Sequence, residues 1–390
     1  MTELAKTEPA AFKAENNFSG GAKLNRLLPV DALRGLIIVV MALDHANLFV
    51  AQQHSRAEHW GLPLPEYDSA LPFLTRFVTH IAAPGFFFLM GIGMLLFAQR
   101  RQERGWSKWA ILRHFWLRGL VLIALQLLIV NRAWELSQDW DLNIYIGVLF
   151  ALGGAMILGS LLLWLPARFL LVLAVVLFVG TELIHPNPSQ WGKIDIDIAN
   201  LLLVRPAGDN NLWSNYPILP WLELVIFGMF FAHWLRDDSR RAYQRGLILG
   251  CSFLIIFVLL RWFDGFGNIR PRAGDSWIDF LNVVKYPPSM TFTMLTMAIN
   301  LVALWAFSRI YEWRHRVLEP LAIFGRTPLF FYVLHLFLYA LMGRLFTPSG
   351  TTIPIMYLYW ITGLLILFPL CFWFGRFKRK QPTYSPVRYF

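Results

Sequence analysis

The sequence predicts an all-α, polytopic integral membrane protein with about ten transmembrane helices in one bundle. Of its 390 residues, 57% are hydrophobic and only 15% are charged, whereas a soluble domain has about 25% charged residues. The apolar residues also gather into runs of the roughly 17–25 residues that cross a bilayer. This composition excludes a soluble enzyme, and no nucleic-acid partner is expected despite the net charge of +11.

Ten apolar runs qualify as spans and divide the chain into three regions. Residues 1–25 are polar, of mixed charge and without the apolar core of a signal peptide, so they predict a cytoplasmic tail. A transmembrane domain follows over 26–376, and 377–390 form a basic cytoplasmic tail. The ten runs are 27–50, 71–98, 116–131, 142–164, 167–185, 217–235, 246–263, 288–311, 327–346 and 352–375.

The positive-inside rule tests this count. The tails and loops on the side of the two termini hold 24 of the 35 Lys and Arg residues, and the loops on the other side hold nine. Such a bias predicts that both termini are cytoplasmic. Cys251 and Cys371 lie in separate apolar runs, which excludes a disulfide framework and a cysteine metal site; no metal is expected.

The first span carries more ionisable groups than a bilayer crossing tolerates without a function, because each costs about 2.5–3.5 kcal/mol at the membrane centre. On a helix, Asp31, Arg34 and His45 share one face, and the Asp31 and His45 ends lie about 21 Å apart. This face therefore places charge near the cytoplasm and a titratable ring near the outer surface. Asp44 precedes His45 directly, so its side chain points about 100° away on a regular helix.

Three other spans bring polar side chains toward the membrane. Arg76 and His80 lie one turn apart in the second span; the eighth span begins after Lys285, Tyr286 and Ser289; the ninth carries Arg326 and His335. Each has a purely structural alternative, which for Tyr286 and the prolines after it is an ordinary helix start. Arg76 could extend its charge to the outer surface, Arg326 could be a positive-inside anchor, and His335 could be a packed structural histidine.

These residue types are suited to group transfer. A histidine near neutrality acts as a general base or as a nucleophile, and Arg76 and His80 could stabilise an oxyanion next to it. Arg26, Arg34 and Arg326, beside a helix start at Thr327–Pro328, are suited to a phosphate group on the inner side. A charged cofactor bound inside, with its reactive end at His45, would join the two ends of the first span.

Two further segments have more than one interpretation. The basic stretch 99–118 predicts an interfacial helix on anionic lipid, with a landing site for an anionic cofactor as the alternative. The long outer loops 51–70, 186–216 and 264–287 are rich in Trp, Asp and Asn. They predict either sugar binding or an aromatic belt at the membrane surface.

Four blocks together resemble a known group of proteins. They are DALRGL…MALDHA with its Arg34-to-His45 spacing, TRFVTHIAAPGFFFLMG (75–91), YPPSMTF (286–292) and FGRTPLFFYVLHL (324–336). The chain is similar to transmembrane acyltransferases, namely the acyltransferase-3 family and the heparan-alpha-glucosaminide N-acetyltransferase family, and most similar to bacterial relatives of the latter.

The resemblance implies acyl transfer across a bacterial inner membrane, from cytoplasmic acetyl-CoA or another acyl-CoA to a hydroxyl or amine of an outer carbohydrate or lipid-linked acceptor. His45 is then the expected catalytic residue, with Asp44, Arg76 and His80 beside it. Arg34, Asp31, Arg26, Arg326 and His335 are expected on the donor side, and Tyr286, Ser289 and Lys285 on the acceptor side. A homodimer is one assembly that this reasoning leaves open.

One position departs from the family pattern. The eukaryotic glucosaminide enzymes carry an Asn near the end of the first helix and a catalytic His in the following loop. By this comparison His45 falls at that Asn, and His54 and His59 fall nearer the family histidine. A different class of function also remains, a proton-coupled transporter or permease that uses intramembrane His, Asp and Arg.

Overall fold

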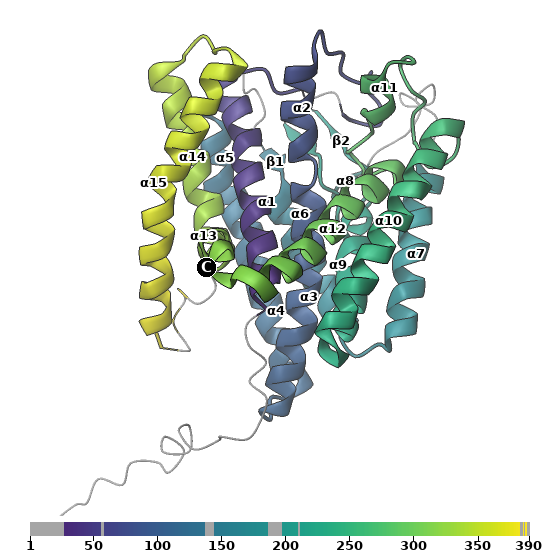
Figure 1. The fold of residues 1–390 in the computed structure, drawn as a ribbon, viewed down its shortest axis with the longest axis vertical. Helices are drawn as coiled ribbons and strands as arrows, with labels where there is room; N and C mark the ends of the chain where they lie inside the picture. Colours follow the sequence, from purple (N-terminus) through teal and green to yellow (C-terminus); the bar gives the residue numbers. More distant parts are fainter. Residues whose placement is uncertain are drawn as a thin grey trace, which may run out of the picture.

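The computed structural model is a bundle of long helices (Figure 1). It describes residues 27–55, 58–136, 144–185, 197–209 and 211–382, with Ser385 and Val387. We call the end that holds Leu28 and Lys380 the lower end, and the opposite one the upper end. Arg26, and with it the predicted N-terminal tail, lies outside the described residues.

Fifteen α-helices occur in the described part of the chain. They are α1 (Leu28–Ala46), α2 (Ala70–Thr79), α3 (Ala82–Glu103), α4 (Lys108–Leu125), α5 (Asn131–Trp134), α6 (Val148–Ser160), α7 (Ala167–Ile184), α8 (Ile198–Leu203), α9 (Ile218–Asp237), α10 (Ser239–Phe263), α11 (Trp277–Leu281), α12 (Met290–Arg314), α13 (Glu319–Gly325), α14 (Pro328–Phe346) and α15 (Ile353–Lys380).

The predicted membrane fold is confirmed, and nine helical segments within the described ranges are long and apolar enough to cross a bilayer. They correspond to nine of the ten predicted spans. The fourth run, 142–164, contains only the 13-residue helix α6, which at about 1.5 Å per residue is too short to cross alone. Residues before it form β1 (Ile144–Ile146) instead.

A small sheet near the upper end accounts for this shortening. Its order is β1-β3-β2, with β2 at Ala207–Gly208 and β3 at Leu212–Ser214. β1 runs parallel to β3, with Tyr145 opposite Trp213, and β2 runs antiparallel to β3. The sheet therefore joins the segment before α6 to the segment before α9.

The second span is broken between α2 and α3, and its sequence explains why. Pro84 has no backbone N–H, and its ring would clash with the carbonyl of His80 four residues earlier. The helix accordingly stops at Thr79 and resumes at Ala82. The Asn300 amide of α12 donates to the Ile81 carbonyl at 3.1 Å, so the break is held against α12 inside the bundle.

α1 lies at the centre of the functional part of the bundle. Its upper end continues into a π-helical turn over Asn47–Ala51, a feature that often accompanies functional sites. At its lower end, Gly35 meets the Leu321 carbonyl, and Gly325 meets the Asp31 carbonyl. A side chain at either glycine would push α1 and α13 apart, so this pair of glycines fixes the depth of Arg34 next to Gly325.

Candidate active site

His45 and His335 are hydrogen bonded to each other inside the upper half of the bundle. Nδ1 of His45 lies 2.7 Å from Nε2 of His335, and the two side chains are 8% and 0% exposed. Nδ1 of His335 in turn lies 2.9 Å from the Phe331 carbonyl. A carbonyl only accepts, so Nδ1 of His335 carries a proton and its Nε2 is the acceptor when the ring is neutral.

This chain of contacts determines the tautomer of His45. Its Nδ1 must donate to His335, which leaves its Nε2 with an unshared electron pair. Nε2 has no hydrogen-bond partner among the described residues. The ring is enclosed by Trp134 at 5.4 Å, Tyr332 at 6.5 Å and Phe49 at 6.4 Å between centroids. His45 is thus held as a neutral imidazole with one nitrogen available for chemistry.

Asp44 does not contact His45, as the 100° between adjacent helical side chains predicts. Its carboxylate pairs with Arg76 of α2 and accepts from the Thr79 hydroxyl at 2.7 Å. His54 of the following loop lies 3.4 Å from its second oxygen. A direct role for Asp44 in orienting the His45 ring is therefore not supported by this geometry.

Arg76 lies between two carboxylates. It pairs with Asp44 on one side and, through Nε and a second nitrogen, with Glu58 on the other. His80 completes the group, with Nε2 2.9 Å from Glu58. Arg76, Glu58 and His80 are each less than 4% exposed, and buried charges of this kind persist only when they are paired. The Arg76 nitrogens are thus already engaged with carboxylates.

Glu58 was not anticipated from the sequence. Burial by itself would raise the pKa of its carboxyl, but Arg76 and His80 next to it hold the pKa well below the ordinary value. It is therefore ionised at neutral pH. Its position in a polar loop gives no periodic signal, and only the pairing with an intramembrane Arg reveals it.

Lys285 and Tyr286 lie against the same group, and Ser289 does not. The Lys285 amine is 5.1 Å from the Tyr286 ring, and burial together with the nearby Arg76 charge lowers its pKa to about 8. The Tyr286 hydroxyl is 3.2 Å from that of Tyr216. Ser289 caps α12, since its hydroxyl accepts from the Phe292 N–H and lies 3.0 Å from the Val284 carbonyl.

His54 and His59, which fall nearer the family histidine in the sequence comparison, have different surroundings. Burial and the charge of Arg76 lower the pKa of His54, although Asp44 opposes the shift. Burial lowers the pKa of His59 to about 3, so this ring is neutral and a weak base near pH 7. His59 packs against Trp60 and Trp213 and its backbone pairs with Tyr286, which indicates a structural role.

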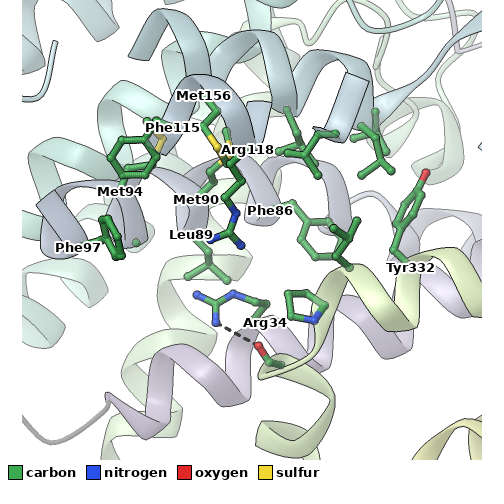
Figure 2. A pocket seen from close by; sticks show the side chains of 18 of the residues that line it. Arg34, Phe86, Leu89, Met90, Met94, Phe97, Phe115, Arg118, Met156 and Tyr332 are labelled. Carbon is green, nitrogen blue, oxygen red and sulfur yellow. Dashed lines mark hydrogen bonds between the residues drawn. The ribbon is translucent and has the colours of Figure 1, made fainter. Parts of the chain in front are cut away.

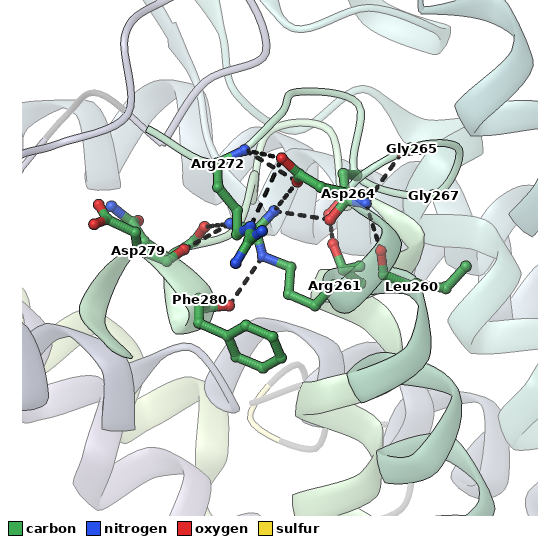
Figure 3. Close-up of polar contacts among 12 residues, drawn as sticks. Leu260, Arg261, Asp264, Gly265, Gly267, Arg272, Asp279 and Phe280 are labelled. Carbon is green, nitrogen blue, oxygen red and sulfur yellow. Dashed lines mark hydrogen bonds and ion pairs between the residues drawn. The ribbon is translucent and has the colours of Figure 1, made fainter. Parts of the chain in front are cut away.

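A network around Arg261 holds the loop that carries Lys285 (Figure 3). Arg261 at the end of α10 donates to the carbonyls of Asp279, Phe280 and Asn282 at 2.6–2.9 Å. It also donates to the Asn268 side chain at 2.8 Å and lies 3.5 Å from Asp264. One buried guanidinium therefore joins α10 to the segment leading into Lys285.

A cavity of about 340 Å³, which we call the lower cavity, opens below His45. Its walls come from α1, α3, α4, α6, α14 and α15, and most of them are Leu, Met and Phe side chains. Arg34 and Arg118 face each other across it (Figure 2). Arg326 and Lys378 also line it, and Tyr332 lines its other end. Because the Tyr332 ring also contacts His45, the cavity leads from four cationic residues to the wall of the histidine pair.

The predicted inner cluster is partly assembled here. Arg34 donates to Asp31 at 3.0 Å and to the Gly325 carbonyl at 3.1 Å. Arg326 lies 3.5 Å from the other Asp31 oxygen and 2.9 Å from Glu319. Asp31 therefore holds the two arginines side by side. His335, which was grouped with them from sequence, is instead hydrogen bonded to His45 and is not among the residues that line the cavity.

Among the described residues, α4 and α6 contribute to the lining of this cavity and α12 does not. One expectation about this region is wrong. Segment 99–118 is not one interfacial helix, because α3 ends at Glu103 and α4 begins at Lys108. Arg118 consequently points into the bundle, which agrees with the alternative of an anionic ligand near this segment.

Comparison with known proteins gives two family matches. Residues 26–255 match the family model described as heparan-alpha-glucosaminide N-acetyltransferase, catalytic, and residues 141–379 match the one described as OpgC protein. Each covers more than half of the chain, and together they extend from α1 into α15. No curated protein shows significant sequence similarity to the chain.

Proposed function

Because the chain belongs to the heparan-alpha-glucosaminide N-acetyltransferase catalytic family, we propose that this membrane acyltransferase uses acyl-CoA, in the first instance acetyl-CoA, as its donor. The donor binds in the lower cavity from the cytoplasm, and the acceptor binds near the upper end. The acceptor is a hydroxyl or amine of a carbohydrate or a lipid-linked sugar. The concentration of Lys and Arg at the lower end supports a cytoplasmic orientation of that end.

One observation carries the proposal, namely that the lower cavity connects a cationic end to the wall of the His45–His335 pair. Arg34, Arg118, Arg326 and Lys378 are suited to phosphate groups. The apolar walls between them and Tyr332 suit a flexible thioester-bearing arm. Tyr332 lies between the cavity and His45, so the thioester has to pass this ring or displace it to reach Nε2.

The unshared pair on Nε2 of His45 supports two routes. In direct transfer, the acceptor gives its proton to Nε2, its oxygen or nitrogen bonds to the acyl carbon, and the carbon–sulfur bond breaks. The CoA sulfur then takes the proton from His45. In the other route Nε2 itself attacks the acyl carbon, the carbon–sulfur bond breaks and CoA leaves as a thiolate. The acceptor then takes the acyl group from Nε2, and its proton goes to the thiolate, which restores the neutral ring. His335 is a positioning residue in both.

The upper polar group forms the acceptor side in this proposal. Lys285 and Tyr286 are the residues through which a polar acceptor would bind, and the ion-paired group of Asp44, Arg76, Glu58 and His80 is the rigid wall behind them. For Arg76 or His80 to donate to an oxyanion, either would have to release a carboxylate that it now holds.

Release of free CoA thiol in the presence of candidate acceptors tests the proposal. His45→Ala should abolish acceptor-dependent thiol release but keep acetyl-CoA binding, since it removes the reacting nitrogen and leaves the cavity intact. Wild-type turnover in this variant would overturn the assignment. If this protein transports a polar solute and does not bind acetyl-CoA, it is a permease and not an acyltransferase.

A further inference from the structure

A second cavity adjoins the lower one at the same end of the bundle. This side cavity has a volume of about 320 Å³ and lies between α13 and α15. Arg326 and Lys378 line both cavities, so these two cations stand at the boundary between the two spaces. Phe372 and Arg379 of α15 line only the side cavity.

The charge of the side cavity is mainly positive. Arg326, Lys378 and Arg379 line it, and Glu319 is the one carboxylate among its lining residues. Glu319 is engaged with Arg326 at 2.9 Å. Arg326 also lies 3.5 Å from Asp31, whereas Arg379 has no ion pair within the described ranges. The side cavity therefore keeps at least the Arg379 guanidinium for an anionic ligand to engage.

Size and shape indicate how one ligand could use both cavities. Pockets for drug-sized ligands measure about 300–1,000 Å³, so each cavity alone is at the lower limit. Acyl-CoA is larger and has three parts: an apolar arm with the thioester, a diphosphate, and an adenosine with a 3′-phosphate. The arm matches the apolar lower cavity, and the diphosphate matches the shared boundary at Arg326 and Lys378.

We propose that the side cavity binds the 3′-phosphoadenosine part of the donor, with Arg379 on the 3′-phosphate and Phe372 beside the base. This inference rests on the proposed function, because it assumes an acyl-CoA donor. It adds a second recognition site outside the path of the acyl group. The 3′-phosphate then selects coenzyme A over shorter thioesters without any contact to the reacting atoms.

The test measures equilibrium binding of acetyl-CoA and of 3′-dephospho-acetyl-CoA to the purified full chain. Arg379→Gln should weaken acetyl-CoA binding about fivefold to tenfold and leave 3′-dephospho-acetyl-CoA binding unchanged. Lys380→Gln is the matched control, since it removes the same charge from the next residue of α15, which lines neither cavity. It should leave both affinities at the wild-type value.

Each outcome is decisive. Equal binding of both thioesters by the wild type, or an equal loss for both in Arg379→Gln, would overturn the inference and leave the proposed function intact. If Lys380→Gln weakens acetyl-CoA binding as much as Arg379→Gln does, the effect comes from the general positive charge of the surface. That result would also overturn the inference. If the wild type binds no acetyl-CoA, both this inference and the proposed function fail.

Discussion

Nδ1 of His45 and Nε2 of His335 lie 2.7 Å apart although 290 positions separate them in the chain. The bond fixes the proton on Nδ1 of His45 because the other nitrogen of His335 faces the Phe331 carbonyl. Whether His45 acts as a base or carries the acyl group, its available Nε2 depends on this second histidine.

His335→Phe should lower kcat about 10-fold to 100-fold with little change in acetyl-CoA affinity, because phenylalanine fills the space and removes the acceptor. His335→Gln should retain more activity, since its amide oxygen can still accept from Nδ1 of His45. Steady-state kinetics with a binding measurement checks both variants. Equal activity in the two would mean that His335 only fills space.

Arg118 should contribute to donor binding and not to the chemical step. Arg118→Gln is expected to raise the dissociation constant of acetyl-CoA about tenfold and to leave kcat at saturating donor unchanged. Arg113→Gln is the control, as Arg113 lies on the same helix, is exposed and is not a lining residue. If the control variant matches Arg118→Gln, the cavity is not the site of the effect.

Glu58 should matter for stability far more than an exposed carboxylate. Removing one member of a buried ion pair costs about 3–5 kcal/mol, so Glu58→Gln should lower the midpoint of thermal unfolding in detergent markedly. Glu135 pairs with Arg132 at the surface, where such pairs contribute at most about 1 kcal/mol. A shift in Glu135→Gln equal to that in Glu58→Gln would contradict the structural role of the buried group.

Lys285 should make the free energy of unfolding increase as the pH rises above 8. Its folded-state pKa of about 8 is below its ordinary 10.5, so the unfolded chain binds more protons between these values and stability rises with pH there. Below pH 8 the cost of the buried charge is fully present. Unfolding midpoints of the wild type relative to Lys285→Met should therefore increase from pH 8 to pH 10, and a flat difference would contradict the lowered pKa.

The sequence could predict where polar groups lie along each helix, but it could not predict which helices meet. Periodicity placed Asp31, Arg34 and His45 on one face of α1, and the ring of Pro84 explains the break beside His80. The approach of α1 to α13 depends on Gly35 fitting against a backbone carbonyl, which no periodicity reveals. That approach determines how Arg34 meets Gly325.

Two groups of the site were beyond sequence reasoning for a physical reason. Glu58 lies in an irregular loop, so its depth depends on how that loop folds over Arg76. Arg118 stands in a basic stretch whose overall amphipathic character favoured the membrane surface. A turn at residues 104–107 changes its direction, and α4 carries it into the bundle.

The most direct test of the central claim, that the lower cavity holds the donor, uses Gly93 of α3. This glycine lines the cavity, and a Cβ added to it meets no atom of the described residues within 4 Å. Gly93→Leu should therefore fill the cavity without disturbing the fold and reduce acetyl-CoA affinity at least tenfold. Gly180→Leu, at an equally open position outside the cavity, should bind as the wild type does. Wild-type acetyl-CoA affinity in folded Gly93→Leu would contradict the claim.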